Sequence, residues 1–151
     1  MLDRLAGVGL RVTRTRKALA ALLFNGENRH VTAEQLHREA SATTKISLAT
    51  IYNTLHVFTR SGLLQEVTVE PGRSFFDTNV APHYHFYVEE THTLLDIPAE
   101  IVLLRLPTHP RGTTLRRVDL IVRVRSAKEA CGISGSMLAR KSPSEETRHE
   151  L

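Results

Sequence analysis

The chain has 151 residues and lacks features that define several classes of protein. Its one cysteine is Cys131, so it can form no internal disulfide, and it has no Cys-x-x-Cys zinc motif. A structural zinc ion would need other ligands. No apolar run approaches the roughly 20 residues that cross a bilayer, and the N-terminus has no apolar core or cleavage site of a signal peptide. We therefore expect a cytoplasmic protein that does not enter a membrane.

Motifs of the common enzyme classes are also missing. The sequence has no recognisable Ser-His-Asp or Cys-His arrangement, no phosphate-binding glycine loop and no pair of carboxylates placed as in a hydrolytic cleft. The sequence therefore predicts a protein that is not an enzyme.

Positive charge is concentrated near the N-terminus. Residues 1–60 hold nine Lys or Arg and four Asp or Glu, a net charge of +5. The remaining residues hold eleven and twelve, a net charge of −1, and the two parts sum to the +4 of the whole chain. A basic first part suggests a polyanionic partner such as nucleic acid.

The first sixty residues read as three helices. Residues 16–24, "RKALAALLF", carry leucines at helical spacing and end at Asn25-Gly26. Thr32 and Gln35 have the spacing of a capping box that opens a short helix ending near Ala40. Ser47 is a good N-cap for a third helix. The apolar stripe of this third helix consists of Leu48, Ile51, Leu55 and Phe58.

A hairpin follows the third helix. Gly62 is placed to end that helix in a left-handed conformation, and "LLQEVTVEPGRSFFDT" then reads as strand, turn and strand around Pro71-Gly72. Three helices followed by a hairpin is the order of a winged helix, whose third helix enters the major groove in helix-turn-helix proteins.

The residues after Asn79 predict a small unit of strands and a helix. We expect a strand pair in "HFYVEE" and "HTLLDI", a helix from Pro98 to Leu104 and a strand from Val118 to Val124. The last strand has one apolar face, which a second copy of the chain could cover. The predicted fold class is α+β: residues 1–77 form a winged-helix domain, residues 78–126 an α/β dimerisation and sensing domain, and residues 127–151 a flexible tail.

The segment "PHYHFYVEE" places His83 and His85 on alternate residues of a predicted strand, so both imidazoles point to the same face. One divalent ion can reach both, although two surface histidines would give the same pattern. The segment also fits His-x-His-x-x-x-Glu, with Glu89, as in the first cupin motif of metal-dependent enzymes. The predicted helices oppose a cupin barrel, and no downstream His-x-x-x-Asn motif supplies the fourth ligand.

Five segments, "GLRVTRTR", "HVTAEQL", "SLATIYNTLHVFTRSGL", "GRSFFDT" and "HYHF", occur in an order and spacing that resemble the Fur (ferric uptake regulator) family. The resemblance spans about residues 7 to 126 and is greatest to the iron- and haem-responsive branch, Irr. It implies a transcription regulator of iron or haem homeostasis whose first domain binds DNA and whose second domain dimerises. A metal or haem site near the hinge would couple the two domains.

The resemblance, together with the exposed polar positions of the predicted elements, gives a set of site residues. The expected DNA contacts are Arg11, Arg14, Arg16, Lys17, Ser47, Thr50, Tyr52, Asn53 and Arg73. The ligands implied for Fe2+, Mn2+ or Zn2+ are His30, Asp77, His83 and His85, and the candidate haem ligands are His83 and His85. The expected partners are an operator in double-stranded DNA, a second copy of the chain, and haem or a protein that delivers it.

Two alternatives remain beside this interpretation. One is the cupin-like metal-dependent enzyme described above. The other is a repressor whose histidines are vestigial and answer to no ligand. The sequence does not decide whether a bound effector would raise or lower the affinity for DNA.

Overall fold

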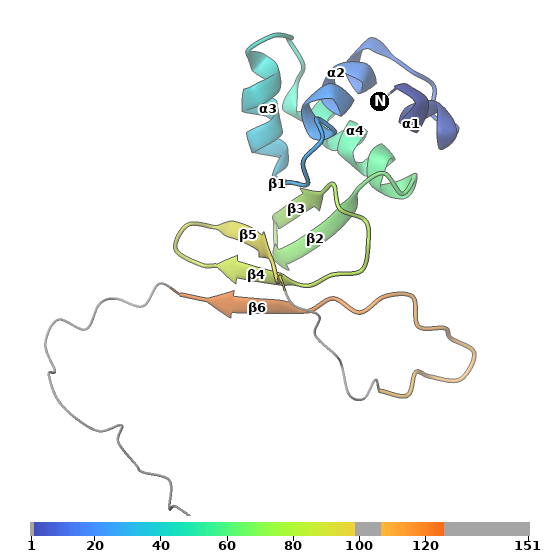
Figure 1. Cartoon of the computed structure of the whole chain (residues 1–151), viewed down its shortest axis with the longest axis vertical. Coiled ribbons are helices and arrows are strands. Elements are labelled where there is room, and N and C mark those ends of the chain that lie inside the picture. Colours follow the sequence, from blue (N-terminus) through green and yellow to red (C-terminus); the bar gives the residue numbers. More distant parts are fainter. Residues whose placement is uncertain (1, 99–106, 126–151) are drawn as a thin grey trace, which may run out of the picture.

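The computed structural model describes residues 2–98 and 107–125, in which helices gather at one end and two small sheets lie below them (Figure 1). The elements of the first part are α1 (Leu2–Gly7), α2 (Arg14–Leu23), β1 (His30–Val31), α3 (Ala33–Ser41), α4 (Leu48–Arg60), β2 (Gln65–Glu70) and β3 (Arg73–Asp77). The elements of the second part are β4 (His85–Val88), β5 (Thr93–Asp96) and β6 (Ile121–Val124). The predicted α+β class and the winged-helix order are confirmed.

Some predictions fall outside the described residues. The predicted helix from Pro98 to Leu104 lies there except for its first residue, and so does the predicted tail of residues 127–151. Among the residues that are described, no helix combines the length and the apolar character needed to span a bilayer.

The three predicted helices of the first part each begin at a side chain that accepts a hydrogen bond from a backbone N–H group of the first turn. Thr13 accepts a hydrogen bond from the backbone N–H of Arg16. Helix α2 therefore begins at Arg14, two residues before the predicted start. The capping box at α3 is complete, because Gln35 Oε1 accepts from Thr32 N at 2.8 Å and Thr32 Oγ1 accepts from Gln35 N at 3.2 Å. Ser47 caps α4, and Gly62 follows that helix with a φ of 76°. The caps hold the ends of α3 and α4 at defined positions.

The helices are held together by one apolar core. Leu19, Leu23, Leu36, Ile51, Leu55, Phe58 and Phe76 are fully buried in it. Burying a side chain of this size stabilises a fold by about 1.5–3 kcal/mol. The short helix α1 was not predicted, because six residues without a cap carry little local signal; it forms where Leu5 is buried in this core.

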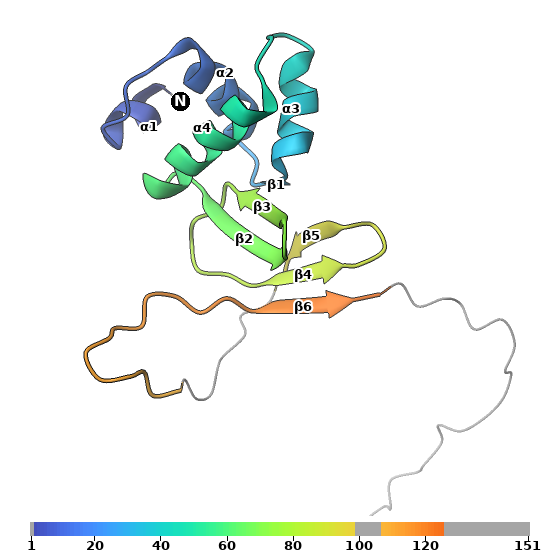
Figure 2. The ribbon, with the colours of Figure 1, turned by 180° about the vertical axis from the view of Figure 1, so that it is seen from behind.

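The first sheet has the strand order β1-β3-β2, with both pairings antiparallel. Strands β2 and β3 form the predicted hairpin, called the wing below, and Gly72 takes a φ of 77° in its turn. Strand β1 was not predicted. It is only two residues long, and it places His30 directly opposite Asp77. Seen from behind, the wing lies between the helices and the second sheet (Figure 2).

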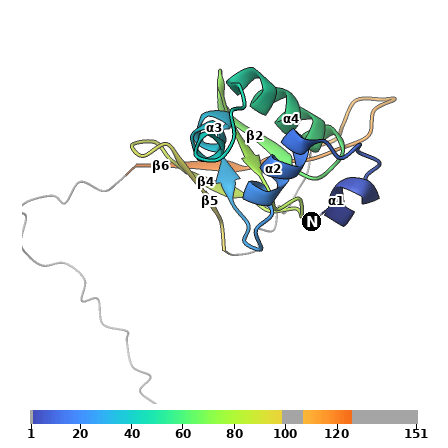
Figure 3. The ribbon, with the colours of Figure 1, turned by 90° about the horizontal axis from the view of Figure 1, so that it is seen from above.

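The second sheet has the strand order β5-β4-β6. The predicted pairing of β4 with β5 is confirmed, whereas β6 runs parallel to β4 and is shorter than the predicted strand of residues 118–124. The reason is that β4 begins at His85, whose N–H donates to the carbonyl of Leu120, so residues before Leu120 extend past the end of their partner strand. From the helical side, α3 and α4 lie over the strands of both sheets (Figure 3).

Candidate metal centre

The ends of four strands bring three histidines and two aspartates together. His30 and Asp77 face each other across β1 and β3, and His85 and Asp96 face each other across β4 and β5. His83 lies two residues before His85, just ahead of β4. One ligand atom from each of these five residues lies within 4.8 Å of all the others. We call this group the metal-ligand cluster.

The ring nitrogens surround the two carboxylates at short distances. Asp77 Oδ2 lies 2.9 Å from His83 Nε2, 3.3 Å from His85 Nε2 and 3.4 Å from His30 Nε2. Asp96 Oδ1 lies 2.9 Å from His30 Nε2 and 3.2 Å from His83 Nε2. The Asp77 side chain is completely buried, whereas that of Asp96 is 39% exposed. The cluster therefore has a closed side at Asp77 and an open side at Asp96.

The orientation of the histidines suits a metal ion better than a set of hydrogen bonds. The Nε2 atoms of His30 and His83 are buried and make no hydrogen bond, although carboxylate oxygens lie 2.9 Å from each. His83 Nδ1 lies 2.7 Å from the carbonyl oxygen of Ala81, so Nδ1 donates its proton there. The Nε2 lone pair of His83 is then directed into the cluster, which is the arrangement found in metal-ligating histidines. Three nitrogens and two carboxylate oxygens suit Mn2+, Fe2+ or Zn2+.

The cluster also perturbs the ionisation of its members. Burial alone would lower the pKa of His30, but the neighbouring Asp77 and Asp96 carboxylates outweigh it and raise that pKa above its ordinary value. Burial alone would raise the pKa of Asp77. The nearby His30 imidazole and the hydrogen bonds of Asp77 with His85 and with the backbone N–H of Asn79 outweigh this and hold the pKa of Asp77 far below its usual range. The negative charge on Asp77 is therefore strongly favoured.

The structure brings together all four predicted ligands, His30, Asp77, His83 and His85, and adds Asp96. Asp96 was missed, although the predicted strand pair contained the signal, since a hairpin of residues 85–90 with 92–97 places Asp96 near His85. Glu89, the third residue of the cupin-like pattern, is not part of the cluster. Its carboxylate lies 2.6 Å from Arg125 Nε instead. The three residues of that pattern therefore do not form one site.

Comparison with known proteins agrees with the family that the order of the sequence motifs indicated. The profile of the ferric uptake regulator family matches residues 7–122 of the chain. The chain belongs to this family. A peroxide-responsive repressor, PerR of Staphylococcus aureus, is 36% identical over 89 residues, which are 58% of this chain and 60% of the relative. The alignment thus spans less than two thirds of that Fur-family protein.

Solved structures of Fur-family proteins resemble this fold. The ferric uptake regulator of Pseudomonas aeruginosa, solved with manganese, has a TM-score of 0.63 and 26% identity, covering 84% of this chain and 98% of its own. A zinc-bound manganese uptake regulator has a TM-score of 0.59 and 25% identity, covering 82% and 98%. These comparisons support the family, and they do not distinguish the Irr branch.

The residues expected to contact DNA lie at α2, on α4 and on the wing of this Fur-family fold. Arg11 precedes α2, and Arg14, Arg16 and Lys17 lie in its first turns. The side chains of Arg11, Arg14 and Lys17 are exposed, whereas Arg16 donates to the carbonyl of Arg11 at 2.9 Å. Arg16 therefore holds the segment before α2, whereas its three basic neighbours are exposed to solvent.

The other expected contacts lie on α4 and on the wing. Asn53 is exposed, and the hydroxyl of Tyr52 donates to Glu34 at 2.6 Å. Thr50 lies within hydrogen-bonding distance of the Ser47 hydroxyl, at 2.8 Å. The guanidinium of the partly exposed Arg73 contacts both Glu70 and Tyr87 of its own chain.

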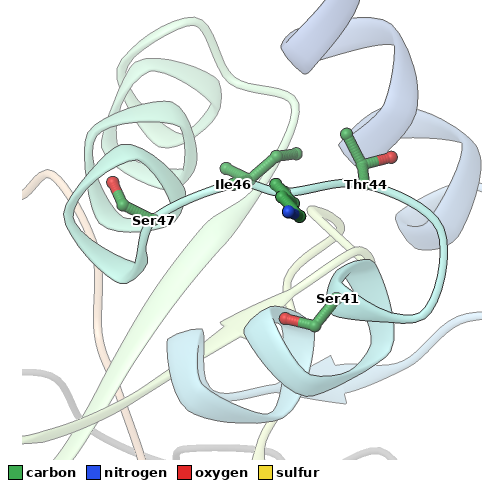
Figure 4. Close-up of a pocket in the computed structure, with 5 residues that line it drawn as sticks. Ser41, Thr44, Ile46 and Ser47 are labelled. Atoms are coloured by element: carbon green, nitrogen blue, oxygen red, sulfur yellow. The ribbon is translucent and has the colours of Figure 1, made fainter.

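A cavity of about 360 Å3 opens at the start of α4 (Figure 4). Its lining consists of Ser41, Thr44, Lys45, Ile46 and Ser47. Lys45 is exposed beside this cavity, and it adds a positive charge ahead of the helix that we expected to meet DNA. Sequence reasoning passed over Lys45, although its place two residues before the predicted N-cap was visible.

Proposed function

We propose that the chain is a metal-responsive transcription regulator that binds operator DNA as a dimer. Its effector is a divalent ion held by His30, Asp77, His83, His85 and Asp96. The observation that carries this proposal is the convergence of five ligand atoms within 4.8 Å of one another. Membership of the ferric uptake regulator family supports it.

The proposed switch follows from the origin of the ligands. His30 and Asp77 belong to residues 1–77, which we propose as the DNA-binding unit, and the other three ligands belong to residues 78–126. Ligation of one ion by both sets favours a single arrangement of the two units. In a dimer that arrangement sets the distance between two α4 helices, which must match one turn of DNA, ~34 Å. Metal occupancy thereby becomes a change in DNA affinity.

The proposed DNA contacts divide into two kinds. Arg11, Arg14, Lys17 and Lys45 would bind phosphates and make affinity fall steeply with salt. Tyr52 and Asn53, on α4, would select bases, because an amide can bond adenine twice and an aromatic ring can pack on a thymine methyl. The acceptor Glu34 holds the Tyr52 hydroxyl at 2.6 Å and so directs the ring before DNA arrives.

The proposed dimer uses the second sheet. The face opposite Tyr87 carries Phe86 together with Leu95, which is 49% exposed. Strand β6 lies at one side of this sheet in the described residues, and its Val122 stands beside Phe86. Apolar side chains of this kind on one face supply the surface that a second copy of the chain would bury.

The test combines selection and titration with the full chain. Duplexes selected from a random pool in the presence of Mn2+ would be labelled, and their affinity measured by fluorescence anisotropy with Mn2+ and with a chelator. We expect affinity to differ at least tenfold between the two conditions, and His85→Ala to abolish the difference. Selection of no duplex, or equal affinity with and without metal, would refute the proposal.

Peroxide response is a second candidate function, because the matched PerR proteins are named for it. It predicts that DNA binding in the presence of Fe2+ is lost after treatment with hydrogen peroxide, whereas binding with Mn2+ persists. The haem alternative, with His83 and His85 as ligands, stays a prediction. Both imidazoles direct Nε2 toward Asp77, at 2.9 and 3.3 Å, and a planar macrocycle requires open space over a ligating nitrogen. Titration with haem, followed by its absorption spectrum, tests it directly.

A further inference from the structure

A second polar cluster joins the wing to the sheet that carries the metal ligands. Tyr87 is only 1% exposed and lies two residues beyond His85 on β4, so the two side chains point to the same face. Across the strand pair, Leu94 is the neighbour of Tyr87 and Asp96 is the neighbour of His85. The cross-strand pair of the metal ligands His85 and Asp96 and the cross-strand pair of Tyr87 and Leu94 are therefore adjacent on one face of the second sheet.

The hydroxyl of Tyr87 is fully used by side chains from two other segments. It donates to Glu70 Oε1 at 2.8 Å and accepts from Arg73 NH1 at 3.3 Å, and both residues flank the turn of the wing. His92 Nδ1, from the turn between β4 and β5, lies 2.9 Å away. Because the hydroxyl has one hydrogen and gives it to Glu70, the Nδ1 of His92 must carry a proton and donate. We call Glu70, Arg73, Tyr87 and His92 the wing latch.

Strand β6 also contacts the Tyr87 ring and the wing, through Arg123. The guanidinium carbon of Arg123 lies 5.3 Å from the centroid of the Tyr87 ring, and the Arg123 NH2 group donates to the carbonyl of Val69 in the wing. Arg123 also pairs with Glu89, with 3.7 Å between NH1 and Oε1. The wing, β4 and β6 are thus connected through the surroundings of one aromatic ring.

Apolar packing accounts for the ring of Tyr87 but not for its hydroxyl. Val67, Val69, Phe75 and Leu94 form a buried cluster around the ring. A phenylalanine would fill this space equally well and would need no hydrogen-bond partner. The turn has an unusual feature as well, since His92 takes a φ of 50°, a left-handed conformation that is unfavourable for a residue other than glycine. Its hydrogen bond to Tyr87 helps to hold the turn in this conformation.

We propose that Tyr87 is a positioning residue that couples the sensing sheet to the wing. Through Glu70 and Arg73 it holds the turn of the wing against the β4–β5 hairpin, so that a shift of β4 at His85 is passed to the wing. Arg73 thereby acts on DNA affinity through the orientation of the wing rather than by reaching DNA itself. This inference rests on the proposed function, since it describes how metal occupancy reaches the DNA-binding unit.

The first test measures coupling with Tyr87→Phe, which keeps the ring and removes the hydroxyl. We expect Mn2+ affinity within twofold of the wild type, because no ligand is changed. The ratio of DNA affinities with Mn2+ and with chelator should fall on the order of fivefold, which is the effect expected when the hydrogen bonds of one hydroxyl group are lost. Tyr84→Phe is the matched control, because the hydroxyl of Tyr84 makes no hydrogen bond within residues 2–98 and 107–125. An unchanged ratio in Tyr87→Phe, or an equal fall in the control, would overturn the proposal.

A double-mutant cycle separates the latch from general loss of stability. Glu70→Ala should lower the same ratio, and the double variant with Tyr87→Phe should be no worse than the more affected single variant. Glu70→Gln keeps an oxygen that can accept from Tyr87 and should restore most of the ratio. Additive losses in the double variant would show two independent effects and would overturn the latch.

Hydrogen exchange tests the latch without DNA. In the metal-loaded protein, the backbone amides of residues 72–74 should exchange faster in Tyr87→Phe than in the wild type or in Tyr84→Phe. Equal exchange in all three proteins would overturn the positioning role. If the wild type shows no metal-dependent DNA binding, the proposed function fails, and the exchange rates still decide whether Tyr87 holds the wing.

Discussion

Replacing Asp77 by asparagine is the sharpest test of the metal-ligand cluster. The Asp77 side chain is completely buried, and its Oδ2 lies between 2.9 and 3.4 Å from three histidine nitrogens. Asparagine has nearly the same shape, and its oxygen can still accept the hydrogen bond that Asn79 N–H donates to Oδ1 at 2.7 Å. The substitution therefore removes a negative charge from the centre of the cluster while leaving its packing in place.

The size of the effect follows from the dimensions of the cluster. At its outer limit of 4.8 Å, two unit charges interact by about 3.5 kcal/mol at an effective dielectric constant of about 20. A divalent ion would gain about 7 kcal/mol from the carboxylate, but desolvation of that carboxylate offsets more than half. The remaining loss of about 3 kcal/mol corresponds to roughly a hundredfold weaker binding of Mn2+.

Thermal unfolding with and without Mn2+ measures this loss. At a Mn2+ concentration of about 100 times the wild-type Kd, the ion should stabilise the wild type by about 2.7 kcal/mol and Asp77→Asn by about 0.4 kcal/mol. This difference corresponds to about 5–9 °C in Tm for a chain of this length. Asp119→Asn is the matched control, because Asp119 is exposed and pairs with Arg117 outside the cluster. Equal metal-induced shifts in Asp77→Asn and in the wild type would refute the reasoning.

Three further predictions concern the metal-free protein and the DNA-binding surface. The pKa of His30 is raised from 6.5, so the stability that His30 contributes should be lost as pH rises through its folded-state pKa. The pKa of Asp77 is lowered from 3.8, so the stability that Asp77 contributes should be lost as pH falls below 3.8. Denaturant unfolding in chelator across this range should show a decline above pH 6.5, and a rise there would contradict it. Thr32→Ala removes half of the capping box and should cost about 1 kcal/mol in the same assay, with Thr114→Ala as an exposed control. Tyr52→Ala should weaken binding to a selected operator more than binding to random DNA, and equal losses would rule out a role in base selection.

Local patterns were sufficient for most of the first half of the fold. The capping box of Thr32, the N-cap Ser47 and the stop at Gly62 are short-range signals, since each depends on residues within one helical turn or on a single backbone angle. The hairpin between β4 and β5 was also predicted, because a strand pair joined by a short turn is nearly as local.

Three long-range features were not predicted, and each has a physical reason. Strand β1 is two residues long and exists because β3 offers an edge to pair with, so it leaves no periodicity in the sequence. The parallel pairing of β6 with β4 joins residues more than thirty positions apart, and the end of β4 limits β6 to Ile121–Val124. The role of Asp96 depended on the register of β5, which the sequence indicated only loosely.

The identities of the donor groups, the helix caps and the basic first segment were set by the sequence alone, because side-chain chemistry and short-range hydrogen bonding need no knowledge of distant residues. Tertiary structure decided which of those groups meet. Strand pairing turned His30, Asp77, His83, His85 and Asp96 into one cluster, left Glu89 with Arg125, and turned Arg73 toward Tyr87. The reason is that strand register and sheet order fix contacts between residues far apart in the chain, and a shift of one residue would reverse the face on which each side chain lies.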